Sequence, residues 1–188
     1  MKEKRGLAQI KTKKSNLGRK KNPLNKFSGR IFIGKELLVG CDGITADKNF
    51  EWLYYAPLNG TKIYRVKITD ILNERLSGEE LDRKVETYSE KPNNGGLSID
   101  DEGNLYLTAM ESNSVAVVLY KDKSIHYILS DEKLLWADGV SYNVSDGFMY
   151  VSAAQVHLGA AFNNGVNKAK APFYIFRFKP LAKGVPFR

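Results

Sequence analysis

The chain has 188 residues, of which 43% are hydrophobic and 27% charged, a composition typical of a folded protein with one sizeable core. No run reaches the roughly 18–20 apolar residues that span a bilayer. The single cysteine, Cys41, excludes an intrachain disulfide and a cysteine-based metal cluster. The net charge of +8 is unevenly distributed: residues 1–30 hold eleven basic residues against one acid and carry +10, whereas the remainder holds 18 basic and 20 acidic residues and carries −2.

Residues 1–29 are predicted to be a basic, disordered leader. They contain one aromatic residue, Phe27, and few aliphatic ones, so they cannot bury enough surface to offset the entropy lost on ordering. The alternative is an arm that binds nucleic acid or an anionic membrane. Because no aromatic residues alternate with the charges, we expect no nucleic acid partner. The basic residues are not followed by the apolar core of about 7–15 residues that a secretory signal needs, so no signal peptide is visible.

A repeated pattern begins after residue 30. A short loop ending in glycine leads into an alternating strand, and a turn then leads into a second strand that contains tyrosine. The three copies of the first strand lie at residues 42–47, 95–100 and 138–143. Their glycines, Gly43, Gly96 and Gly139, are 53 and 43 residues apart. Repeats of about 40–50 residues with several strands each are typical of propeller blades.

Further strands are predicted at residues 62–66, 114–120, 124–129 and 173–178, and a short helical excursion at residues 68–81 with Asp70 as its N-cap. The predicted fold class is therefore an all-β protein, with residues 30–188 forming about three blades of a β-propeller. Propellers close with about four to eight blades, and three blades leave two sheet faces unpaired. We expect either a homodimer that completes the ring or a missing N-terminal half.

Several stretches point to one family. They are residues 41–44, 53–58 and 62–66, the pair Lys91-Pro92, residues 135–139, and, most specifically, Gln155, His157 and residues 162–165 and 172–177. Together they resemble the major royal jelly protein/yellow family, and most closely its bacterial members related to L-dopachrome tautomerase. The resemblance implies a six-bladed, gluconolactonase-like propeller of which this chain is the C-terminal half. It also implies an extracellular or periplasmic location.

The loops that enter the innermost strands of a propeller surround its central channel. Asp42, Gly95 and Asp138 hold equivalent places in the three repeats. By resemblance to propeller lactonases such as gluconolactonase, Asp42 and Asn94 would bind a divalent cation such as Ca²⁺, which could polarise a lactone carbonyl. Gly95 stands where an aspartate is expected and weakens that site, so no cofactor is assigned with certainty. The alternative is that Asp42 and Asp138 cap turns through Asx-type hydrogen bonds.

His157 lies in a long loop, at about residues 153–171, which is a candidate lid over the channel. With Gln155 and Asn163 it would contact a ligand or act as an acid or base near neutral pH. The alternative is that His157 and Asn163 brace the loop itself.

The expected function is binding of a small ligand in the channel, with tautomerase- or lactonase-like activity in which His157 is catalytic. The ligand-binding residues would be Asp42, Asn94, Asp138, Gln155 and Asn163. Two alternatives stay open: a non-catalytic secreted or periplasmic ligand-binding protein, and an inactive truncated fragment. The fold alone does not decide between them.

Overall fold

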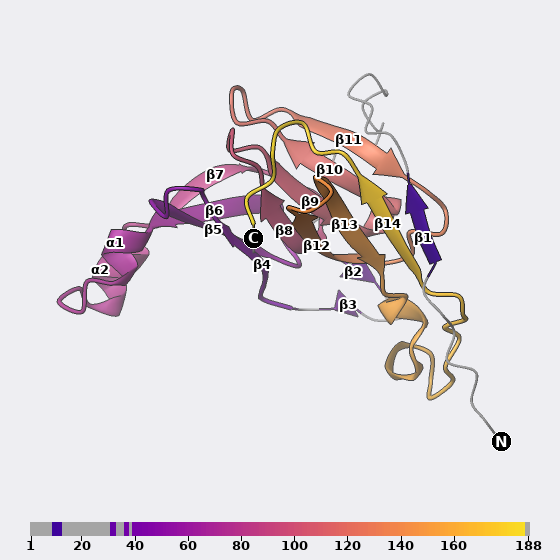
Figure 1. Ribbon diagram of the computed structural model, residues 1–188. Helices are drawn as coiled ribbons and strands as arrows, with labels where there is room; N and C mark the ends of the chain where they lie inside the picture. Colours follow the sequence, from indigo (N-terminus) through magenta and orange to yellow (C-terminus); the bar gives the residue numbers. More distant parts are fainter. Residues whose placement is uncertain (1–8, 13–30, 33–35, 38, 187–188) are drawn as a thin grey trace.

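The computed structural model describes residues 9–12, 31–32, 36–37 and 39–186. Strands make up most of its regular structure and form three four-stranded sheets, which are packed one behind another (Figure 1). A short separate hairpin pairs β2 (Ile31–Phe32) with β3 (Glu36–Leu37). The predicted all-β, propeller-type fold is confirmed, and each four-stranded sheet is one blade.

In each blade the strands follow one another in the chain, except for the outermost strand of the third blade. The first sheet contains β4 (Cys41–Ala46), β5 (Trp52–Pro57), β6 (Lys62–Lys67) and β7 (Glu86–Glu90). The second contains β8 (Asn94–Ile99), β9 (Leu105–Ala109), β10 (Ser114–Val118) and β11 (Ile125–Ser130). The third contains β12 (Ala137–Asn143), β13 (Phe148–Ala153), β14 (Tyr174–Phe178) and β1 (Gln9–Thr12).

The fourth strand of the third sheet comes from the other end of the sequence. Strand β1 runs parallel to β14, with Gln9 opposite Tyr174 and Thr12 opposite Arg177. These four residues belong to the stretch predicted as a disordered leader, whose other residues, 1–8 and 13–29, lie outside the described part of the chain. An N-terminal strand thus covers the edge that β14 would otherwise expose.

The connection from β6 to β7 contains two short helices, α1 (Ile68–Ile71) and α2 (Gly78–Asp82). The prediction that Asp70 is an N-cap is wrong, because Asp70 lies inside α1. The cap is Ser77, whose hydroxyl accepts a hydrogen bond from the Glu80 backbone at 3.3 Å while the Glu80 carboxylate accepts one from the Ser77 backbone at 2.9 Å. This reciprocal capping box fixes the start of α2.

The hydrophobic core consists of two layers, one between each pair of adjacent blades. Tyr54 and Ile63 of the first sheet pack against Leu97 and Leu107 of the second. The other face of the second sheet meets the third in a larger layer that includes Tyr106, Val117, Met149, Val151, Phe176 and Phe178. The inner strands β4, β8 and β12 lie side by side and form one wall of the channel. Three short 3-10 turns complete the described structure, at Met110–Ser112, Val156–Leu158 and Ala160–Phe162.

Candidate functional site at the channel mouth

Each inner strand begins with a β-bulge. The pairing register shifts at residues 41–43 in β4, at residues 94–97 in β8 and at residues 137–140 in β12. A bulge leaves residues out of the ladder and turns their side chains in a new direction. Asp42 and Asp138 lie in these bulges, at the positions that the repeat aligns. The three bulges therefore bring polar groups from successive blades to one end of the channel.

Asp42 and Asp138 are close enough for the charge of Asp42 to act on Asp138. Asp42 is exposed and Asp138 is half-buried. Burial raises the pKa of both carboxyls, and the charge of Asp42 raises the pKa of Asp138 further. No hydrogen bond or ion pair joins either carboxylate to another residue in the described part of the chain, so the Asx-type caps of the alternative explanation are not made there. Two such carboxylates attract a cation.

Asn94, in the bulge of β8 between β4 and β12, carries a third oxygen. Its side chain is fully buried, and its Nδ2 donates a hydrogen bond to the carbonyl of Gly96 at 3.0 Å. Its Oδ1 accepts no hydrogen bond from the described residues. A buried amide oxygen without a donor is costly unless a ligand or water satisfies it. Asn94 Oδ1 is therefore the strongest sign that something binds here.

The glycine at position 95 has a steric reason. A Cβ atom there would stand 2.9 Å from Oδ1 of Asp138 and 3.3 Å from Cε of Met110. Gly95 therefore leaves the space that the Asp138 carboxylate occupies. An aspartate at this position would push that carboxylate aside instead of simply adding a ligand.

The residues fit a divalent cation in part. Among the described residues, no three His, Cys, Asp or Glu side chains come together as a metal site. The donors are thus two carboxylates, from Asp42 and Asp138, and the amide oxygen of Asn94. Ca²⁺ accepts this oxygen chemistry but takes six to eight ligands. The remaining oxygens would come from water, from the bound ligand or from further blades.

His157 lies near this group of oxygens. Its ring stacks on Trp136, with centroids 5.7 Å apart and planes at 18°. Trp136 packs with Leu58 and Met110, and Met110 approaches Gly95 as described above. Burial lowers the pKa of His157, so the imidazole is neutral at pH 7, and no described residue bonds its buried Nδ1. A neutral imidazole with a free ring nitrogen can accept a proton.

Gln155 and Asn163 hold the loop that carries His157. The Gln155 side chain donates to the carbonyl of Lys170 at 2.9 Å and accepts from the Lys170 backbone N–H at 3.0 Å. Asn163 Nδ2 donates to the carbonyls of His157 and Gly159, both at 2.9 Å. These bonds favour the bracing explanation for Asn163. Ligand binding by Gln155 and Asn163 stays a prediction.

A sequence model settles the family. The model described as major royal jelly protein matches residues 23–179. The chain belongs to the major royal jelly protein family. The resemblance stated from the sequence is thereby confirmed at the level of the family, while the subtype related to L-dopachrome tautomerase stays a prediction. No curated protein is significantly similar to the chain in sequence.

Solved structures place this family member among propellers. A luciferin-regenerating enzyme is similar with a TM-score of 0.52 and 13% identity, over 81% of this chain and 49% of that one. A putative gluconolactonase is similar with a TM-score of 0.51 and 11% identity, over 76% of this chain and 46% of that one. At these identities the likeness concerns the fold alone. The chain spans about half the length of either structure. Within the described residues, no helix is long and apolar enough to cross a membrane.

Lys91 is a buried charged residue that sequence reasoning missed, and the exposed Glu111 is the acidic residue whose charge acts on it. Lys91 is completely buried three residues before β8, and its ammonium donates to the carbonyl of Pro92 at 3.2 Å. Burial lowers the pKa of Lys91 to about 8, although the charge of Glu111 opposes this change. Burial also raises the pKa of Glu111, against a hydrogen bond from Asn93 and the charge of Lys91. The family pattern included Lys91-Pro92, but nothing in the local sequence indicated that the lysine is enclosed.

Proposed function

We propose that this member of the royal jelly family binds a small ligand at the channel mouth, together with a divalent cation such as Ca²⁺. Asp42, Asp138 and Asn94 would hold the cation. One observation carries the proposal: the carboxylates of Asp42 and Asp138 come from bulges in separate blades, their charges act on each other, and neither has a partner among the described residues. A bound cation would relieve this repulsion and would also satisfy Asn94 Oδ1.

The chemistry proposed is lactonase- or tautomerase-like. A cation held at Asp42 and Asp138 supplies polarisation of a carbonyl oxygen on the ligand. His157, neutral at pH 7, would take a proton from the ligand or return one. Trp136 fixes the plane of the imidazole by stacking on it. The second candidate is a binding protein without catalysis, and the chain of hydrogen bonds that fixes the His157 loop is equally compatible with it.

Thermal melts with and without Ca²⁺ test the cation site. At a free concentration one hundred times its Kd, a ligand stabilises the folded state by about 2.7 kcal/mol. For a chain of this size, that corresponds to roughly 5–10 °C. Asp42→Asn and Asp138→Asn should abolish the shift, and Asp122→Asn, at an exposed aspartate in the turn between β10 and β11, should retain it. An equal shift in all four proteins, or none in the wild type at millimolar Ca²⁺, would refute the site.

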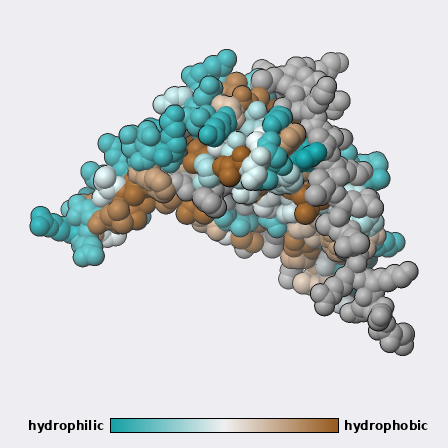
Figure 2. Space-filling model, viewed as in Figure 1, coloured by the Kyte–Doolittle hydropathy of each residue, from teal (hydrophilic) through white to brown (hydrophobic). Residues whose placement is uncertain are grey.

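We further propose that a second copy of the chain completes the ring. The outward face of the first sheet is apolar: Ile44 is 56% exposed and is paired with Tyr55, which stacks on Tyr64 at 5.5 Å. Figure 2 shows hydrophobic side chains along the lower edge of the molecule, where β4 and β5 run in Figure 1. The outward face of the third sheet carries the paired residues Tyr150 and Arg177.

Arg177 already lies over the ring of Phe148 at 4.7 Å, so this face presents aromatic and cationic groups together, which suit the aromatic rings of the first sheet. The propellers similar to this chain are about twice its length, so two copies would supply a ring of their size. Each copy would also bring Asp42, Asn94 and Asp138 to the shared channel, which would double the number of oxygens. The competing arrangement is a longer protein whose own N-terminal half fills the gap.

Light scattering distinguishes these arrangements. Wild type should have twice the monomer mass of 21.1 kDa and melt cooperatively. Ile44→Lys should give monomers, whereas Val144→Lys, at a residue equally exposed at 57% but away from this face, should remain dimeric. A wild-type monomer or a drifting, aggregated mass would exclude the dimer and favour the truncated fragment. An extracellular or periplasmic location is part of the same proposal and rests on the family.

A further inference from the structure

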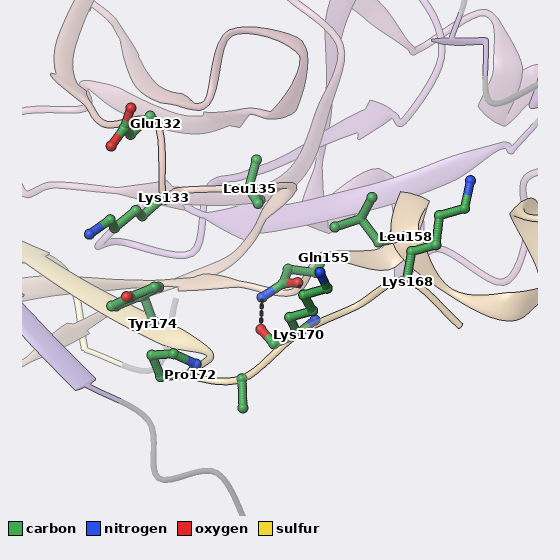
Figure 3. A pocket seen from close by; sticks show the side chains of 10 residues that line it. Glu132, Lys133, Leu135, Gln155, Leu158, Lys168, Lys170, Pro172 and Tyr174 are labelled. Carbon is green, nitrogen blue, oxygen red and sulfur yellow. Dashed lines mark hydrogen bonds between the residues drawn. The ribbon is translucent and has the colours of Figure 1, made fainter. Parts of the chain in front are cut away.

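A cavity of about 410 Å³ lies outside the channel, beside the third sheet. We name it the lysine pocket and define it by Lys133, Leu135, Leu158, Lys168, Lys170 and Tyr174. Its walls come from the β11–β12 connection, from both ends of the loop at residues 153–171 and from β14. The volume is within the range of sites that bind small molecules. Figure 3 shows Lys133 and Tyr174 on one side of it, and Leu158 and Lys168 on the other.

The walls of this pocket are held by hydrogen bonds. Gln155 is 5% exposed, and its amide makes the two bonds to the Lys170 backbone described above (Figure 3). The Lys168 backbone N–H donates to the carbonyl of Leu158 at 2.8 Å. The end of the long loop is thus fastened to its beginning on two sides of the cavity. The pocket is preformed, which lowers the entropy lost on binding.

The lining separates an apolar floor from a cationic rim. The floor contains Leu135, Leu158 and Pro172, with the ring of Tyr174 at one end. The three lysines of the pocket are exposed, and Glu132 is the one acidic residue among the lining side chains. In the described part of the chain no carboxylate lies within ion-pair distance of their ammonium groups. Lys133 Nζ lies 5.7 Å from the centroid of Tyr174, directly beside the apolar surface.

We propose that the lysine pocket binds small amphipathic organic acids, with one carboxylate on the lysine rim and a ring-sized apolar body on the floor. An ammonium group gains most from an anionic acceptor, and the excess of cations draws anions towards the rim. The apolar floor favours a ligand with an apolar group that is removed from water on binding, and inorganic anions have no such group. This site is separate from the proposed channel site and does not depend on it.

The probe is 2-naphthoate, titrated by fluorescence or calorimetry. Its uncharged amide should bind at least tenfold more weakly, and inorganic phosphate at equal concentration should not displace it. Raising the salt concentration from 50 to 500 mM should weaken naphthoate binding, because the rim is exposed to solvent. Equal binding of acid and amide, displacement by phosphate, or no binding at millimolar naphthoate would overturn the proposal.

Two sets of substitutions locate the site. The first set removes the rim charges but keeps polar side chains of similar length, by exchanging Lys133, Lys168 and Lys170 for glutamine. The control removes three exposed charges elsewhere, by exchanging Lys48, Lys84 and Lys121 for glutamine. The first variant should lose at least tenfold in naphthoate affinity, and the control should lose less than twofold. The melting temperature and the Ca²⁺ response should be the same in both, so a failed channel proposal would leave this test unaffected. Equal losses in the two variants would show that binding follows net charge and would refute the pocket.

Discussion

Replacing Lys91 by methionine tests the buried charge next to the channel. The pKa of Lys91 falls from 10.5 to about 8 on folding, so the folded protein releases a proton more readily than the unfolded chain. Below pH 8 the charged lysine therefore destabilises the folded state. This penalty disappears as the pH rises from 8 to 10.5, and the wild type gains stability relative to the variant over that window.

The magnitude follows from the size of the pKa change. At 1.36 kcal/mol per pKa unit, the penalty is about 3 kcal/mol, and about 2.5 kcal/mol of it should disappear between pH 7 and pH 10. At pH 7 Lys91→Met should be the more stable protein, although loss of the hydrogen bond to the Pro92 carbonyl offsets about 1 kcal/mol of the gain. Removing the lysine also removes a positive charge that lowers the pKa of Glu111.

Urea unfolding of wild type and variant at pH 7 and pH 10, at one protein concentration, measures this difference. Lys121→Met is the matched control, because Lys121 is exposed and its loss should leave the pH dependence unchanged. The reasoning fails if the difference in unfolding free energy between wild type and Lys91→Met is the same at both pH values. It also fails if Lys121→Met shows the same pH dependence as Lys91→Met.

Three further predictions concern single side chains. Asp138→Asn should raise the melting temperature at pH 7 without Ca²⁺, because the raised pKa of Asp138 destabilises the ionised folded form; scans at falling pH should show this advantage disappear once the carboxyl is protonated. Gly95→Asp should reduce the Ca²⁺-dependent thermal shift, since its Cβ would stand 2.9 Å from Asp138 Oδ1; a larger shift than in the wild type would show that the bulge accepts the new side chain. Tyr106→Phe should cost about 1–3 kcal/mol in urea unfolding, because the buried hydroxyl donates to Asp100 at 2.8 Å and accepts from the Leu181 N–H at 2.7 Å. A change below about 0.5 kcal/mol would mean that water replaces that hydroxyl.

The repeat could be predicted because it depends on local sequence features. Each blade alternates apolar residues over two or three strands and turns at glycine, and these features need no knowledge of distant contacts. Gly103 and Gly147 adopt positive φ values of 84° and 69° in the turns between the first two strands of their blades, as such hairpins require. The repeat predicted that Asp42 and Asp138 occupy equivalent positions, and the structure shows that both lie in a bulge at the start of an inner strand.

Features that depend on long-range contacts could not be predicted. Nothing in the basic residues around Gln9–Thr12 indicates a strand, because the partner is β14, more than 160 residues away. The burial of Lys91 is equally invisible, since lysine in a loop is ordinarily exposed. The hydrogen bonds from the Gln155 amide to Lys170 were equally hidden, because they depend on how a loop of nearly twenty residues folds back; ligand binding by Gln155 stays a prediction. In each case the residue type is uninformative and its partner decides its role.

Two segments of the chain contribute to both proposed sites. In the β11–β12 connection, Trp136 faces the channel cluster while the preceding Leu135 lines the lysine pocket. In the 3-10 turn after β13, His157 stacks on Trp136 and the next residue, Leu158, lines the pocket. In each of these two segments, one residue thus faces the channel and its neighbour in the sequence faces the lysine pocket. The hydrogen bonds that hold the pocket walls therefore also hold the neighbouring residues of the Trp136–His157 stack in place.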